Sequence, residues 1–146
     1  MKKKVLILFV AMVMLFALAA PLASSAQVIR YDRTIFTRYN DALIPSVEQG
    51  RITSRFFWHG NRTTNRLTSD RSITVSTTAM KNHGFDQITR EWQWFNTSTA
   101  GGTGYGVVSH RFFTGINVFG LVIGTTRHGH HGLIVHANGV SEVVWP

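Results

Sequence analysis

The sequence predicts an all-β fold: a single-domain antiparallel β-sandwich or barrel of about eight strands, following an N-terminal signal peptide. Three observations predict it. After Gln27 the chain is rich in Thr, Val, Ile and aromatic residues and poor in helix formers. Glycines recur there at short intervals, as they do at the turns of all-β proteins. Residues 27–146 are enough for one domain with its own core, and no linker or repeat divides them.

Residues 1–26 have the features of a signal peptide. A basic segment, Lys2 to Lys4, precedes an apolar run from Val5 to Ala20, and the small residues Ser24-Ser25-Ala26 follow. We therefore expect cleavage after Ala26 and a secreted, extracellular all-β domain over residues 27–146. A retained membrane anchor is the alternative, but no basic stop-transfer cluster follows the apolar run.

Eight segments have strand character: 28–37, 52–58, 72–79, 88–95, 106–113, 116–125, 132–137 and 140–145. In 72–79 apolar and hydroxyl side chains alternate, which predicts one packed and one wet face. Segment 115–124 is apolar on both faces, which is typical of a central strand buried on both sides. Segment 39–50 is expected to form a turn or a single helical turn, because Pro45 would interrupt a longer helix. In 84–95 a strand is preferred to a helix, although Phe85, Ile88, Trp92 and Phe95 have helical spacing.

The last hairpin has the clearest turn signal. Asn138-Gly139 lies between two β-prone runs, which predicts a two-residue type I′ turn. That turn would pair His136 with Ser141, on the same face as Ile134 and Val143.

Composition limits the chemistry available to the chain. There is no cysteine, so disulfide scaffolds, thiol catalysis and thiolate metal sites are excluded. Without the three signal lysines, twelve basic residues remain against seven acidic ones, and all but Lys81 are arginine. Arginine binds phosphate and carboxylate through a planar fork, so we expect an anionic partner. A solubilising basic surface is the alternative.

Segment 51–71 is interpreted as an Arg-rich loop between two strands, beside an aromatic run. Arginines on such a loop can hold anionic groups while a nearby aromatic ring stacks on a base or sugar. The tryptophans 92 and 94 would share a strand face and could add a stacking platform, although a core position is the alternative. The candidate ligand-binding residues are therefore Arg51, Arg55, Trp58, Arg62, Arg66, Arg71, Trp92 and Trp94.

The histidines are candidate metal ligands. Side chains two apart on a strand point the same way, so His128 and His130 could share a zinc or copper ion. His131 could join them if a glycine bends the chain, and His136 could join through the fold. A glycine- and histidine-rich surface turn is the alternative, and no other cofactor is expected.

These features favour a non-catalytic protein that binds an anionic polymer or cell-envelope surface, either an envelope glycopolymer or nucleic acid. Sequence-specific recognition of nucleic acid has no motif to support it. A secreted antimicrobial or toxin-like protein acting on membranes is the second hypothesis, and a metal-binding protein the third. A small nuclease using Glu91, Arg90 and His136 is the fourth. The sequence does not predict an oligomeric state.

Overall fold

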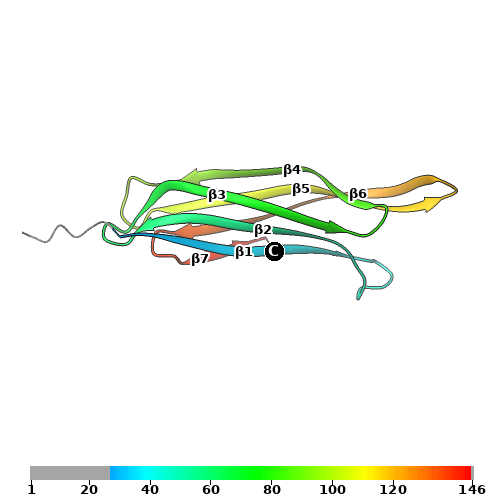
Figure 1. The fold of residues 1–146 in the computed structure, drawn as a ribbon, viewed down its shortest axis with the longest axis horizontal. Coiled ribbons are helices and arrows are strands. Elements are labelled where there is room, and N and C mark those ends of the chain that lie inside the picture. Colours follow the sequence, from blue (N-terminus) through cyan, green and yellow to red (C-terminus); the bar gives the residue numbers. More distant parts are fainter. Residues whose placement is uncertain (1–26, 146) are drawn as a thin grey trace, which may run out of the picture.

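The computed structural model describes residues 27–145 and consists of two antiparallel sheets with no helix in that range (Figure 1). One sheet has the order β1 (Val28–Asn40), β2 (Glu48–Asn61), β3 (Arg66–Ala79). The other has the order β4 (His83–Phe95), β5 (Thr103–Val118), β6 (Leu121–His136), β7 (Ser141–Val144). The predicted all-β antiparallel class is confirmed, with seven strands in the described part rather than eight. The predicted signal peptide lies outside the described residues.

The hydrophobic core lies between the two sheets. Every second side chain of β2 points inward, and Ile52, Phe56 and Trp58 are almost completely buried. They pack against Leu133 and Val135 of β6 in one continuous cluster. Within residues 27–145, no helix is long and apolar enough to cross a membrane.

Segment 115–124 is not a buried central strand, as its two apolar faces had suggested. It forms the end of β5, a turn and the start of β6, with Val118 paired to Leu121 across the turn. The two turn residues, Phe119 and Gly120, have φ angles of 49° and 87°, as a two-residue type I′ turn requires. Because β4 begins opposite Thr114, this end of the hairpin has no neighbouring strand.

The C-terminal hairpin differs from its predicted register by one residue. Val135 pairs with Ser141, so the loop contains Ala137, Asn138 and Gly139. Only Gly139 has a positive φ, 92°, which is the pattern of a three-residue loop rather than a type I′ turn. A one-residue shift moves each side chain of a strand to the opposite face. Ser141 is therefore not opposite His136.

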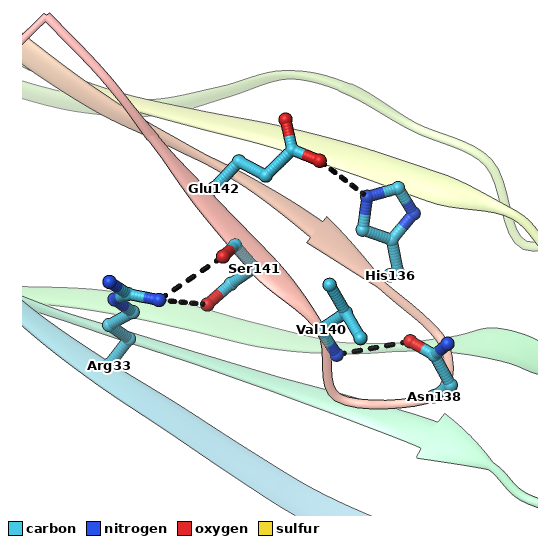
Figure 2. Close-up of polar contacts among 6 residues, drawn as sticks. All are labelled: Arg33, His136, Asn138, Val140, Ser141 and Glu142. Carbon is cyan, nitrogen blue, oxygen red and sulfur yellow. Dashed lines mark hydrogen bonds and ion pairs between the residues drawn. The ribbon is translucent and has the colours of Figure 1, made fainter.

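One polar contact links the edges of the two sheets. The Arg33 guanidinium, on β1, donates to the backbone oxygen of Ser141 at 3.1 Å and to its hydroxyl at 3.2 Å (Figure 2). The Asn138 side chain accepts a bond from the Val140 amide at 3.0 Å and holds the preceding loop. The short strand β7 is thereby held against β1.

Candidate anion-binding face

The outer side of the three-stranded sheet carries four arginines on two neighbouring strands. Strands alternate their side chains between two faces, so the residues between the buried ones of β2 point to solvent. In register they lie beside the outward residues of β1, with Arg51 opposite Arg38, and His59 opposite Arg30. We call this surface the arginine face; it comprises Arg30, Arg38, Arg51, Arg55, Phe36 and Phe57.

Each phenylalanine of the arginine face carries two guanidinium groups. Arg30 and Arg55 lie 4.4 and 4.7 Å from the centre of the Phe57 ring. Arg38 and Arg51 lie 4.8 and 5.5 Å from the centre of Phe36. Stacking on a ring favours the cation electrostatically and restricts its rotation, and it leaves the N–H groups at the edge of the guanidinium able to donate hydrogen bonds.

Two carboxylates orient these arginines. Arg55 donates to Asp32 at 2.8 Å, and this hydrogen bond lowers the pKa of the Asp32 carboxyl. Arg51 donates to Glu48 at 2.7 Å and lowers the pKa of that carboxyl in the same way. Both acids therefore stay ionised at neutral pH. Four arginines against two carboxylates still leave the face with excess positive charge.

Hydroxyl groups and two shallow hollows complete the face. The outward residues of β3 are exposed hydroxyl residues: Ser72, Thr74, Ser76 and Thr78. One hollow of about 290 Å³ is lined by two arginines, one carboxylate and three other residues: Arg30, Phe57, His59, Asp70, Arg71 and Ser72. A second, of about 240 Å³, adjoins Arg55 and the threonines around it. Cationic and hydroxyl donors thus follow one another along the strands.

The other predicted arginines lie at one end of this sheet. Segment 51–71 is a hairpin whose strands continue almost to the turn, and not the long loop expected from its polar composition. Arg62 and Arg66 flank that turn and are exposed. Arg71 lies 4.4 Å from the centre of the Phe95 ring at the edge of the sheet, and it reaches the hollow beside Arg30.

The tryptophans do not form the predicted platform. Trp58 is 1% exposed, and its indole N–H donates to the His136 carbonyl at 3.0 Å, so it belongs to the core. A break in register between Trp92 and Trp94 places them on opposite faces of β4. Trp92 packs on the core residue Phe56, whereas Trp94 lies outside against Tyr105. The prediction that both indoles share a face is wrong because of this bulge.

The histidine run is also divided between two faces. His128, His130 and His131 belong to the continuous strand β6, not to a turn. His128 and His130 share the outer face, as predicted, and line a hollow of about 460 Å³ with Arg111. His131 points into the core, and His136 lies at the end of β6, 4.0 Å from Glu142 (Figure 2).

This division separates the predicted metal ligands. Among residues 27–145, no three histidine or acidic side chains are placed to hold a metal ion. The predicted four-histidine site is therefore not assembled in the described part of the chain. The three nuclease candidates are not brought together either: Glu91 and Arg90 lie on β4, and His136 lies on β6 beside Glu142.

A polar layer crosses the core where the buried histidines lie. His131 bonds to the hydroxyls of Ser54 at 2.6 Å and Thr37 at 3.0 Å. His110 bonds to the Tyr39 hydroxyl at 2.7 Å. Gly129 has no room for a side chain, because a Cβ there would lie 2.2 Å from that hydroxyl. Burial lowers the pKa of both histidines to about 4, so both are neutral at pH 7.

Sequence reasoning missed four of the six residues of the arginine face. Arg30, Phe36 and Arg38 lie on β1, and Phe57 lies on β2. A signal was present: the outward residues from Arg30 to Arg38 alternate with the inward Tyr31 and Ile35 at the period of a strand. What the sequence did not contain was the cross-strand register, which brings these residues beside β2.

Fold and site together define a class: an antiparallel two-sheet protein with a cationic, aromatic-stacked outer face. Comparison of the chain with protein-family models, with curated proteins and with solved structures finds no match.

Proposed function

We propose that the protein binds an anionic glycopolymer of the cell envelope, without catalysis, through the arginine face. The observation that carries this proposal is the pair of guanidinium groups on each of two outward-facing phenylalanine rings, the exposed Phe36 and the half-buried Phe57. Arginine forks suit the paired oxygens of phosphate and carboxylate groups.

The arrangement favours binding because the arginines are already ordered. Immobilising a long side chain normally costs about 0.5–1.5 kcal/mol on binding. Stacking on Phe57 and the bond to Asp32 have already restricted Arg55. Within residues 27–145, Arg30 forms no ion pair, so its charge is available to a ligand.

The rest of the face is better suited to binding a glycopolymer than to recognising nucleic-acid bases. The β3 hydroxyls can bond to sugar hydroxyls and phosphate oxygens, and the hollows continue along the strands. Contacts to phosphate and sugar groups hold a polymer in place without recognising a base sequence. The predicted signal peptide would deliver the protein to the compartment where such polymers occur.

Immobilised poly(glycerol phosphate) provides the test. We expect the double variant R30Q/R55Q to bind it about tenfold more weakly than the unchanged protein, because two preordered phosphate contacts are lost. The matched control R90Q/R127Q removes the same charge from the four-stranded sheet and should change binding by less than about twofold. Equal weakening by both variants would mean that net charge, and not this face, governs binding.

Competition identifies the polymer class. Single-stranded DNA should displace the protein only at higher phosphate concentration than soluble poly(glycerol phosphate) does. If DNA competes better, the arginine face binds nucleic acid in preference to glycopolymer, and the glycopolymer proposal is wrong.

A further inference from the structure

The free end of the β5–β6 hairpin is the most apolar exposed surface of the described chain. Its core-side face carries four exposed aliphatic residues, and Val122 is exposed on the other face. Phe119 is fully exposed at the apex. The only polar side chain among residues 115–124, Asn117, bonds to the Gly120 amide and so closes the turn at 2.9 Å. The four aliphatic residues are Ile116, Val118, Leu121 and Ile123.

Phe119 has a backbone conformation that disfavours it. A positive φ is unusual for a bulky residue, and asparagine is the residue preferred before glycine in a type I′ turn. The chain therefore holds a large aromatic ring at its outermost point against its own backbone preference. Strain of this kind persists where the side chain has a task, and an exposed ring at an apex contributes nothing to the core.

Two other connections place apolar residues at the same end of the molecule (Figure 1). The loop between β1 and β2 exposes Leu43 and Ile44, and the turn between β3 and β4 exposes Met80. The Met80 amide bonds to the Gln49 carbonyl at 2.9 Å, which places that turn beside the start of β2. Apolar side chains from three connections thus surround one end, which is more than isolated exposed residues would give.

Positive charge lies close behind these apolar residues. Lys81 follows Met80 directly, and Arg127 lies on β6 opposite Phe112. Neither forms an ion pair within residues 27–145. Of the acids nearby, Glu48 and Asp86 are paired with arginines. The Asp41 carboxylate, in the loop with Leu43 and Ile44, accepts hydrogen bonds from the amides of those two residues and from the Gln49 side chain. Apolar tips followed by free cations match the layers of an anionic bilayer, in which phosphates lie outside the hydrocarbon.

We propose that this end inserts into the surface of an anionic lipid bilayer, with Phe119 deepest. A protein partner covering the core-side face of the hairpin would leave Phe119 and Val122 in water, whereas lipid surrounds all of them. From Gly115 to the turn the hairpin extends about 13 Å, less than half of the ~30 Å hydrocarbon core. The hairpin therefore cannot span the bilayer, and its unpaired edges favour a tilted, shallow position.

A fluorophore attached to a single cysteine tests the proposal, because the chain contains no other. The variant L121C, labelled with an environment-sensitive dye, should show a blue shift with vesicles of phosphatidylcholine and phosphatidylglycerol. The shift should need far more lipid with phosphatidylcholine alone. V28C, exposed in β1, is the matched control and should show no shift. Equal shifts at both sites, or none at Leu121, would overturn the proposal.

A second variant separates insertion from folding. Adding F119N to the labelled protein should weaken partitioning about tenfold or more, because the ring no longer leaves water. The same variant should unfold at an equal or higher temperature, because asparagine accepts this φ. Unchanged partitioning of F119N would contradict the proposal.

Two further measurements are informative. The first distinguishes lipid insertion from self-association, and the second distinguishes lipid insertion from polymer binding. A blue shift of labelled L121C that grows with protein concentration without lipid would assign this end to a second copy of the chain and overturn lipid insertion. R30Q/R55Q should keep the full shift at saturating lipid, since the altered residues lie on the arginine face. Failure of polymer binding and failure of insertion are therefore distinguishable.

Discussion

The two buried histidines tie the stability of the fold to pH. His110 is 3% exposed and His131 is 1% exposed, and burial keeps both neutral, while each bonds to a hydroxyl of the opposite sheet. Their pKa of about 4 in the folded protein lies below the usual value of 6.5 that the unfolded chain would have. Between these values the unfolded chain binds more protons than the folded protein, so acid favours unfolding.

We expect the free energy of unfolding to fall as the pH is lowered from 6.5 towards 4. Each buried histidine contributes on the order of 1 kcal/mol per pH unit in this window. The carboxyls of Asp32 and Glu48 have lowered pKa values, so their ion pairs lose stability only at lower pH. Urea unfolding at pH 7 and pH 5 measures the slope.

The variant H131Q checks the assignment of this pH dependence. Glutamine can still bond to Ser54 and Thr37 but does not titrate, so the slope between pH 7 and 5 should fall by about half. The absolute stability of the variant does not enter this comparison. An unchanged slope in H131Q would show that His131 is not one of the groups responsible.

At the scale of elements, β7 is the weakest part of the four-stranded sheet. It contains four residues, pairs only with β6, and is held from the other side by the bonds of Arg33 to Ser141. Exposed bonds of this kind contribute little to global stability. They can still control local opening, because a short edge strand opens independently of the rest of the fold.

The variant R33A should therefore speed amide hydrogen exchange in β7 while changing the free energy of unfolding by less than about 1 kcal/mol. Exchange followed by mass spectrometry over the C-terminal peptide measures this. R90A, on the outer edge of β4, is the matched control and should leave β7 unchanged. Equal protection of β7 in R33A would show that this contact does not hold the strand.

The sequence predicted strands well where their residues alternate and less well where tertiary contacts decide. In 72–79 the inward Ile73 and Val75 pack against the core as expected. Segment 115–124 was misinterpreted because an apolar run is equally compatible with a doubly buried strand and with a hairpin beyond the sheet. The two structures differ in whether a neighbouring strand covers the segment. Here β4 begins opposite Thr114 and leaves it uncovered, which depends on tertiary contacts and not on local sequence.

Local irregularities explain the other errors in the candidate sites. The bulge between Trp92 and Trp94 shifts the pairing by one residue, and alternation alone does not reveal it. Gly129 could have marked a bend near the histidines, yet it lies within the continuous strand β6. A side chain at this position would collide with Tyr39 and His110. The arginine-rich segment was found from composition, but its partners on β1 depend on strand register.

At the scale of the whole molecule, the two proposed binding surfaces are made of different residues. The arginine face covers the outer side of one sheet, and the apolar connections gather at one end of the molecule (Figure 1). We infer that a bilayer-bound molecule would keep the arginine face outside the lipid. The two proposed contacts are then compatible in one molecule.

Nuclear magnetic resonance of the isotope-labelled protein, titrated with short poly(glycerol phosphate) chains, tests polymer binding most directly. We predict shift changes that follow the outward residues of β1 and β2, including Arg30, Arg55 and Phe57, and that disappear as salt is raised. The outer face of the four-stranded sheet, around His128 and His130, should remain unchanged. Changes centred on those histidines, or spread evenly over both sheets, would contradict the assignment of binding to the arginine face.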